Sequence, residues 1–210
     1  DTQLTDYRVL LWGDSLAAQL LPGVKSQQER YGFALSQRTA SSCPPATDLG
    51  YGDRGNCNEI NLATMRYVEQ SRPDVVVING RWPLVDAEAE SRLTKLVVFL
   101  RSQQVKKVVL FGPTPDWLPD IRSLLIKQRF SGGVIPEFLT PPAGAWAATQ
   151  AENLRLRRFA RKLGVVYIEP IEYLCRESEC LVRVSNDIPA GLIASDHDHM
   201  TAQASVFLFR

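Results

Sequence analysis

Short apolar runs alternate along the chain with longer segments in which apolar residues recur at helical spacing. The short runs predict buried strands at residues 9–11, 32–35, 75–78, 108–111 and 165–168. The longer segments predict amphipathic helices at residues 58–70, 87–104 and 148–163. Such alternation is typical of a parallel sheet with right-handed crossovers through helices. With no internal repeat or linker-like stretch, the pattern predicts one α/β domain over residues 1–210.

Residues 112–146 interrupt this alternation. They hold six prolines and two tryptophans, Trp117 and Trp146. Because the segment follows the fourth predicted strand, we expect it at the carboxyl edge of the sheet, where open α/β sheets bind ligands. Tryptophan faces suit the apolar C–H surfaces of sugar rings. A substrate-binding loop and simple packing onto the domain are equally good interpretations of this excursion.

Composition supports one globular enzyme domain and excludes some partners. A chain of 210 residues buries roughly 70% of its unfolded surface. The net charge of +1 argues against nucleic-acid binding, and the basic cluster at residues 155–162 is best interpreted as a solvated helix face. No run reaches the ~18–20 apolar residues of a membrane helix, and no signal-peptide pattern occurs. Since the first predicted strand begins so near Asp1, we expect a domain excised from a longer protein.

The four cysteines allow three disulfide connectivities. Local pairing is the simplest and joins Cys43 to Cys57 and Cys175 to Cys180. A metal site is the rival, but neither histidine adjoins a cysteine and no C-x-x-C occurs, so we predict no metal. Disulfides indicate an oxidising compartment. The loop closed by the first pair is worth about 3 kcal/mol of stability in the chain-entropy model.

Ser15 lies in the string Gly-Asp-Ser-Leu at residues 13–16, directly after the first predicted strand. A serine on such a strand-to-helix turn is exposed at the carboxyl edge of the sheet, beside free helix N–H groups that suit an oxyanion. A serine nucleophile needs a histidine base and an orienting carboxylate. Asp196 and His199 supply both at Asp-x-x-His spacing, while His197 is interpreted as a spectator or a supporting group. A bland turn and a polar loop would each explain one motif alone, but their combination favours a catalytic triad.

These motifs resemble the SGNH (GDSL) hydrolase superfamily. The strings at residues 9–22, 42–45 (Ser-Cys-Pro-Pro) and 112–115 (Gly-Pro-Thr-Pro) look like one branch, the periplasmic SGNH domain fused to membrane acyltransferase-3 proteins that O-acetylate cell-surface polysaccharides. The resemblance implies a three-layer α/β/α sandwich with a mostly parallel five-stranded sheet. It also implies acyl transfer by a triad of Ser15, His199 and Asp196.

The superfamily also uses a glycine and an asparagine that supply oxyanion donors. The glycine position falls on Ser42, whose backbone N–H would still serve, beside that of Ser15. The Gly-x-Asn block places Trp82 where the asparagine is expected, and Asn79 could substitute only if the strand ended differently. We expect the substrate-binding residues to be Arg81, Trp82 and Trp117.

The resemblance implies an O-acetyltransferase domain that passes an acetyl group from its serine to a hydroxyl of a cell-surface glycan such as lipopolysaccharide O-antigen. Its partners would be that glycan and the acyltransferase-3 membrane domain of the same protein, at the periplasmic face of a bacterial inner membrane. We expect no cofactor, with the acyl donor supplied through the membrane domain. A carbohydrate esterase with the same triad and an idle glycan-binding domain are the alternatives.

Overall fold

The computed structural model describes residues 7–48, 55–82, 87–127 and 134–210. Its centre is a five-stranded sheet of β1 (Arg8–Gly13), β2 (Ala34–Thr39), β3 (Val75–Asn79), β4 (Lys107–Phe111) and β6 (Val166–Ile168). The strand order is β2-β1-β3-β4-β6, and every neighbouring pair is parallel. The predicted parallel α/β sheet is therefore confirmed. Gly13 pairs with Thr39 on one side and Asn79 on the other, so three strands end together at one edge.

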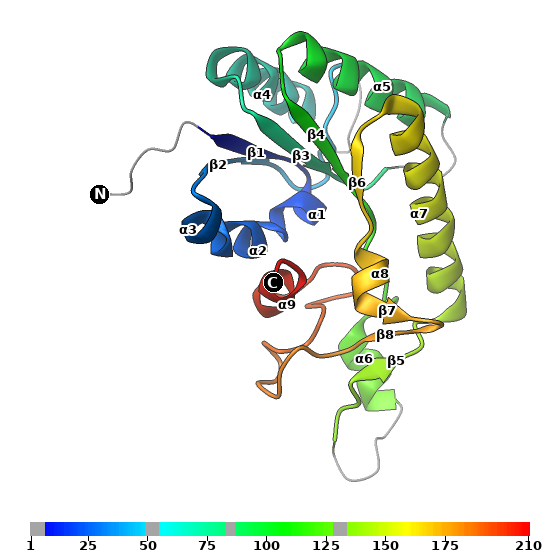
Figure 1. The fold of residues 1–210 in the computed structure, drawn as a ribbon. Helices are drawn as coiled ribbons and strands as arrows, with labels where there is room; N and C mark the ends of the chain where they lie inside the picture. Colours follow the sequence, from blue (N-terminus) through cyan, green and yellow to red (C-terminus); the bar gives the residue numbers. More distant parts are fainter. Residues whose placement is uncertain (1–6, 49–54, 83–86, 128–133) are drawn as a thin grey trace.

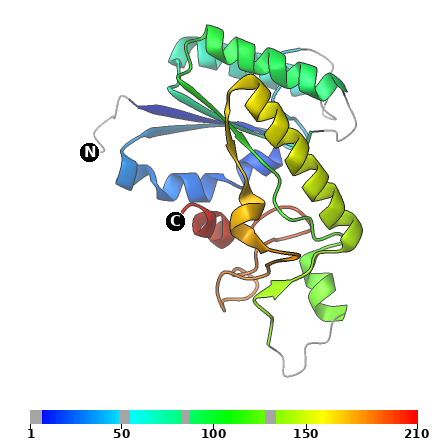
Figure 2. The ribbon, with the colours of Figure 1, turned by 45° about the vertical axis from the view of Figure 1, so that its right-hand side comes forward.

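One face of the sheet is covered by α4 (Cys57–Ser71), α5 (Ala87–Ser102) and α7 (Ala143–Leu163). Side chains of a strand alternate between the two faces. Leu10 and Trp12 of β1 accordingly join the core that lies under these helices. In Figure 1, α4 and α5 lie above the sheet, and Figure 2 shows α7 running along the β6 side toward the lower part of the molecule.

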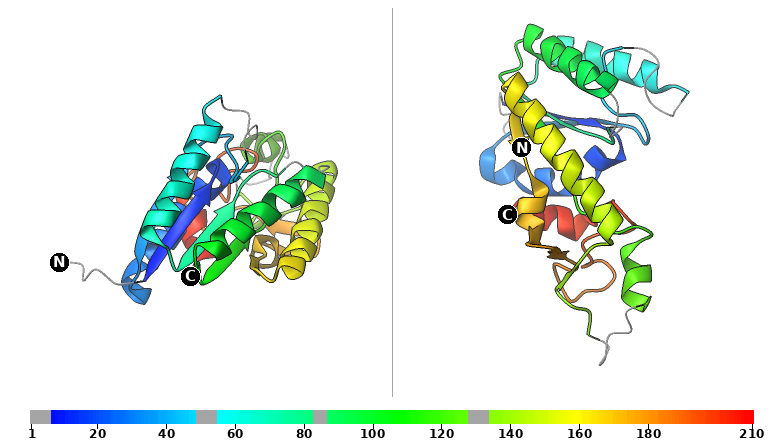
Figure 3. Two further views of the ribbon diagram at one scale, coloured as in Figure 1. Left: turned by 90° about the horizontal axis from the view of Figure 1, so that it is seen from above. Right: turned by 90° about the vertical axis from the view of Figure 1, so that its right-hand side faces the viewer.

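The other face carries α1 (Ser15–Ala18), α2 (Leu21–Ser26), α3 (Gln28–Tyr31), α8 (Pro170–Leu174) and α9 (Ala202–Leu208). Leu11, which alternates with Leu10 and Trp12, packs here in a second core with Phe111 and Ala204. The two views of Figure 3 show helices on both sides of the sheet, which makes the three layers of an α/β/α sandwich.

Several element boundaries differ from the sequence prediction. β2 begins at Ala34 rather than residue 32, because Gly32 caps α3 in the left-handed region at φ 58°. The helix expected after Ser15 is divided into α1 and α2, and Pro22 lies in the first turn of α2, where its missing N–H costs nothing. α7 begins at Ala143, five residues before its predicted start.

The segment at residues 112–146 forms elements that the apolar pattern did not reveal. It contains α6 (Ile121–Lys127) and β5 (Phe138–Leu139). β5 pairs with β8 (Glu179–Leu181), which pairs with β7 (Cys175–Arg176), in a small antiparallel sheet. This sheet lies beyond α8 at the bottom of Figure 1. Strands of two or three residues are too short to show a period-2 pattern.

Both expected disulfides are present, Cys43–Cys57 and Cys175–Cys180. The first joins the loop after β2 to the start of α4, and the second joins β7 to β8. In the described part of the chain, no helix has both the length and the apolar character needed to cross a bilayer.

Candidate active site

Ser15 is the first residue of α1 and follows the end of β1 by two positions. The close approach of β1 and β3 requires glycine at position 13, because a Cβ there would lie 1.8 Å from the carbonyl oxygen of Asn79. The sequence folds this way locally because Asp14 caps the helix, accepting a hydrogen bond from the Leu16 N–H at 2.8 Å. The half-buried Ser15 side chain is thereby held at the carboxyl edge of the sheet.

Ser15, His199 and Asp196 form one hydrogen-bonded series. The Ser15 Oγ lies 2.8 Å from Nε2 of His199, and Nδ1 of the same ring lies 2.8 Å from Oδ2 of Asp196. Asp196 also accepts the backbone N–H of His199 at 2.8 Å through Oδ1. The structure therefore brings together all three residues that the sequence predicted, across a separation of 184 positions between Ser15 and His199.

The electrostatics of this series favour an ionised carboxylate. Partial burial raises the pKa of Asp196, but the hydrogen bonds from the backbone N–H and imidazole of His199 outweigh it, so the pKa lies below its usual range. A carboxylate ionised at neutral pH can orient an imidazole and stabilise its protonated form. The arrangement has the geometry of a nucleophile, a base and an orienting acid.

A second carboxylate, Asp198, lies against the same imidazole. Its Oδ1 is 3.1 Å from Nδ1 of His199, and its Oδ2 makes an ion pair with the guanidinium of Arg81. Asp196, Asp198 and His199 each offer one potential metal-ligand atom within 4.8 Å of the others. The imidazole of His199 therefore lies between the carboxylates of Asp196 and Asp198, and its Nδ1 is already hydrogen-bonded to Asp196. Sequence analysis missed Asp198, although it is part of the same motif.

Asp14 is a further residue that the sequence analysis did not single out. Only 2% of the residue is exposed, and Oδ2 accepts the backbone N–H of Arg81 at 2.7 Å while Oδ1 caps α1. Burial raises the pKa of Asp14, although these two N–H groups and the positive charge of Arg81 oppose the rise. Asp14 thus ties the serine turn to the loop after β3. Its position before a predicted helix was the available signal, because aspartate is a preferred N-cap.

Ser42 lies in a tight turn after β2, in which the Cys43 N–H donates to the Ala40 carbonyl at 3.2 Å. Its φ of 55° is in the left-handed region, which favours the glycine expected at this position. The turn is anchored by the Cys43–Cys57 disulfide and by Asn61, whose amide donates to the Pro44 carbonyl.

Asn79 does not stand free to act as an oxyanion donor. Its side-chain amide donates to the Leu16 carbonyl at 3.0 Å, and its side-chain oxygen accepts the Gly80 N–H at 2.8 Å. Only 4% of the residue is exposed. Asn79 therefore joins the end of β3 to the helix that begins at Ser15, which corrects the suggestion that it substitutes for the missing asparagine.

The expectation that Trp82 and Trp117 bind substrate is corrected by their burial. Each is 1% exposed. Trp82 packs in the core under α4 and α5, and its indole N–H has no hydrogen-bond partner among the described residues. Trp117 packs in the core on the other face, and its backbone N–H donates to the His197 carbonyl at 2.6 Å. Both rings therefore fill the two cores that flank the sheet.

His197 lies close to the site without joining the hydrogen-bonded series. Its Nδ1 is 3.1 Å from Oδ1 of Asp116, and its Nε2 is 3.5 Å from Oδ1 of Asp198. The ring therefore lies between the loop after β4 and the acid that contacts His199. Whether His197 supports the reaction or is a spectator stays a prediction.

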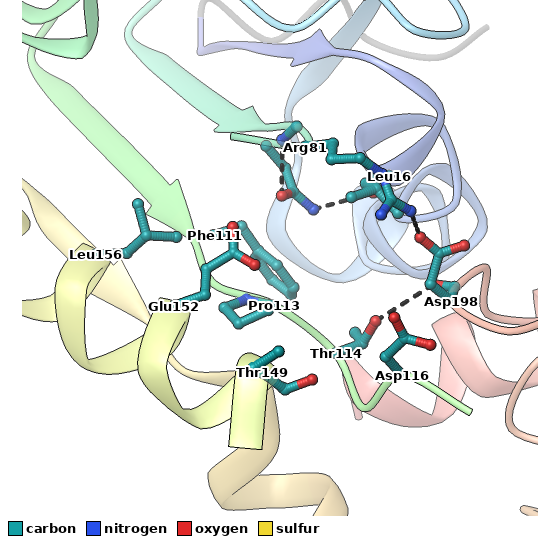
Figure 4. Close-up of a pocket in the computed structure, with 13 residues that line it drawn as sticks. Leu16, Arg81, Phe111, Pro113, Thr114, Asp116, Thr149, Glu152, Leu156 and Asp198 are labelled. Carbon is teal, nitrogen blue, oxygen red and sulfur yellow. Dashed lines mark hydrogen bonds and ion pairs between the residues drawn. The ribbon is translucent and has the colours of Figure 1, made fainter. Parts of the chain in front are cut away.

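A cavity of about 110 Å³ opens next to this cluster. Figure 4 shows its lining, with Arg81 and Asp198 on one side and the α7 side chains Thr149, Glu152 and Leu156 on the other. The segment after β4 contributes Pro113, Thr114 and Asp116. Of the residues expected to bind substrate, the structure brings Arg81 alone to this cavity, and the start of the 112–146 excursion lines it as well.

The family model described as "SGNH domain (fused to AT3 domains)" matches residues 1–210. No curated protein is a significant sequence match to this chain.

Solved structures share the fold. The periplasmic domain of a lipopolysaccharide acetyltransferase from Salmonella ser. Paratyphi A superposes with a TM-score of 0.80 at 23% identity, covering 99% of this chain and 82% of that one. A carbohydrate acetylesterase family member from Sinorhizobium meliloti gives 0.54 at 14% identity, covering 97% and 94%. A catalytic mutant of an acetylxylan esterase from Geobacillus stearothermophilus gives 0.54 at 11% identity, covering 100% and 94%.

Proposed function

The chain belongs to the SGNH domains that are fused to AT3 domains, and from that premise we propose that it is an O-acetyltransferase acting through an acetyl-serine intermediate at Ser15. One observation carries the proposal: the unbroken hydrogen-bonded series from Ser15 Oγ through His199 to Asp196. An idle binding domain would have no need to keep a hydroxyl, an imidazole and an ionised carboxylate in register.

In the first half of the reaction, the Ser15 Oγ attacks the carbonyl carbon of an acetyl donor while its proton passes to Nε2 of His199. Asp196 holds the Nδ1 proton and stabilises the imidazolium that forms. Collapse of the tetrahedral intermediate breaks the bond to the leaving oxygen, which takes the proton back from Nε2. Ser15 is left as an acetyl ester and His199 is neutral again.

In the second half, the hydroxyl of a glycan gives its proton to Nε2 and its oxygen attacks the acetyl carbon. The bond to Ser15 Oγ then breaks, and Oγ regains the proton from the imidazolium. We assign the oxyanion donors to the backbone N–H groups of Ser15 and Ser42. Two facts support them: N–H groups in the first turn of a helix have no partner within it, and the Ser42 turn is fixed by a disulfide.

The same chemistry with water as the acceptor would make the domain an esterase. The exposure of the series favours this second candidate, because 31% of the His199 side chain and 49% of the Asp196 side chain are accessible. Water at about 55 M competes unless the acceptor hydroxyl is oriented, and orientation can be worth roughly 7–11 kcal/mol. A transferase therefore needs an acceptor site next to Ser15.

The family and the fold also support a proposal for the wider setting of the domain. The AT3 fusion supports a membrane acyltransferase domain as partner in the full-length protein, supplying the acetyl donor without a cofactor in this domain. The similarity to a lipopolysaccharide acetyltransferase periplasmic domain supports a cell-surface glycan as acceptor and a periplasmic location. The two disulfides support an oxidising compartment.

Ser15→Ala tests the proposal. Incubated with p-nitrophenyl acetate, the wild-type chain should gain the mass of one acetyl group on Ser15 and release p-nitrophenol. The variant should lose turnover by a factor on the order of 10⁴ to 10⁶, because members of a triad act as a unit. Ser102→Ala, at the exposed end of α5, is the matched control and should keep wild-type turnover. Wild-type rates in the Ser15 variant would refute the acetyl-serine mechanism.

A further inference from the structure

We propose that the cavity lined by Glu152 is the acceptor subsite and that it binds the hydroxyl-bearing edge of a neutral sugar ring. The inference rests on the proposed function for its biological meaning, but its geometry stands by itself. Leu16, directly after Ser15, and Asp198, in contact with the His199 ring, both line this cavity. A ligand held there lies beside the reacting groups.

Glu152 is distinguished by what its carboxyl group lacks. It belongs to α7 and points into the cavity (Figure 4). No hydrogen bond from a described residue reaches it. Glu169, which lies close to the same helix, differs in this respect. Its carboxylate accepts hydrogen bonds from the Asn153 amide and from Nε of Arg157, so it has a structural role. A half-buried carboxyl group without such partners is costly, which makes a role in binding ligand its best explanation.

The chemistry of the lining identifies the class of ligand. Glu152 and Asp116 present hydrogen-bond acceptors to the cavity, and Arg81 is already paired with Asp198. Carboxylates bind groups that donate, so a hydroxyl-rich ligand fits. An acetyl group offers only an acceptor oxygen, and an anionic sugar would be repelled. The apolar side chains among them suit the C–H face of a sugar ring: Leu16, Phe111, Pro113 and Leu156.

The size of the cavity agrees with a small part of a glycan. Pockets for drug-sized ligands measure about 300–1,000 Å³, whereas this one holds about 110 Å³. One edge of a single ring can enter while the rest of a polysaccharide stays outside. This is the arrangement that a transferase needs to orient one hydroxyl among many.

The protonation behaviour of Glu152 fits the same role. Burial raises the pKa of Glu152 to about 7, against the opposing positive charges of Arg155 and Arg81, while Asp14 adds to the rise. Near neutral pH the group can therefore accept from one sugar hydroxyl when ionised and donate to another when protonated.

Binding can be measured without chemistry by following the methyl resonances of Thr149 and Thr114, which line the cavity, by NMR. The probes are methyl α-glycosides of glucose, galactose, mannose and rhamnose, with methyl α-glucuronoside as the anionic counterpart. We expect at least one neutral glycoside to shift these signals and the glucuronoside to bind more weakly than the glucoside. Glu152→Gln should weaken the affinity for the neutral glycoside about 10-fold or more. The same change should reduce the difference in affinity between the glucoside and the glucuronoside. Glu69→Gln, at an exposed position on α4, is the control and should change neither the affinity for the neutral glycoside nor its difference from that for the glucuronoside.

A second pair of variants blocks the cavity without altering charge. Ala148 lies on its rim and is exposed, so leucine there should fold normally and fill the entrance. Ala148→Leu should weaken glycoside binding and lower acetyl transfer from p-nitrophenyl acetate to the glycoside that binds. Ala147→Leu, exposed on α7 and outside the lining, is the matched control for both readouts.

Three results would overturn the proposal: no glycoside in the panel binds, binding survives Glu152→Gln and Ala148→Leu unchanged, or the glucuronoside binds as well as the glucoside. These outcomes are independent of the acetyl-serine mechanism. If Ser15→Ala keeps full turnover while Glu152→Gln still weakens glycoside binding, the sugar subsite stands and the acetyl-serine mechanism falls.

Discussion

Glu152 should make the folded protein less stable as the pH rises, and Glu152→Gln should remove that loss. Burial beside the cavity lifts the pKa of Glu152 from 4.5 to about 7. The folded chain therefore binds this proton more tightly than the unfolded chain. Below about pH 4.5 the side chain is neutral in both states, and as the pH rises toward and through 7 the folded state is penalised for holding its charge.

The size of the effect follows from the same two values. A pKa change of one corresponds to about 1.36 kcal/mol. The rise from 4.5 to about 7 therefore limits the loss of unfolding free energy to about 3 kcal/mol, and about 2.5 kcal/mol of this loss falls between pH 5 and pH 8. Water in the cavity screens part of this charge, so we expect a loss of about 1–2.5 kcal/mol. With a urea slope of about 2.5 kcal/mol per molar, the midpoint of unfolding should fall by up to about 1 M.

The assay is urea unfolding of the wild-type chain and of Glu152→Gln at pH 5 and pH 8, followed by tryptophan fluorescence. Both proteins share every other titrating group, so the difference between their pH dependences isolates Glu152. The difference should grow in favour of the glutamine variant toward pH 8. If the difference in unfolding free energy between the two proteins is the same at pH 5 and pH 8 within about 0.5 kcal/mol, the argument that this carboxyl group is desolvated is refuted.

Four other substitutions test the frame of the site. Gly13→Ala should cost several kcal/mol of stability, since the added Cβ would lie 1.8 Å from a backbone oxygen, whereas Gly144→Ala in α7 meets no atom within 4 Å and should raise the melting temperature slightly. Equal effects of the two alanines would contradict the claimed close approach of β1 and β3. Asp196→Asn should lower kcat by about 10⁴, the loss seen when the orienting acid of a triad is neutralised. Asp198→Asn should lower it only about 10-fold, because His199 keeps its 2.8 Å partner; the reverse order would make Asp198 the orienting acid.

Much of this protein could be predicted from local sequence. The apolar runs placed all five strands of the main sheet. The three central strands, β1, β3 and β4, are mostly buried, because the side chains of a parallel strand between two helical layers face two cores at once. The Asp-x-x-His spacing was informative for a similar reason. Asp196 reaches both the backbone N–H and the ring of His199 within one turn, so local geometry fixes their contact.

The direction in which some side chains point could not be predicted from the sequence. Trp82 and Trp117 follow strands at the carboxyl edge, which suggested exposed rings, yet both indoles turn into the cores. Amphipathic aromatic residues suit either place, and the choice is made by the volume that the neighbouring helices leave to be filled. Asn79 likewise met a partner, the Leu16 carbonyl, that lies 63 positions away.

By itself, the sequence predicted the alternation of strands and helices, the local disulfides, and Ser15, His199 and Asp196 as a candidate triad. Each of these depends on residues that are neighbours in the chain or on chemistry that few residue types can perform. Tertiary structure alone decided that Glu152 faces a cavity with no hydrogen bond from any residue in the described part of the chain, and that Asp198 lies between His199 and Arg81. The physical reason is that desolvation and ion pairing depend on the distances between packed elements, and those distances are set by the whole fold.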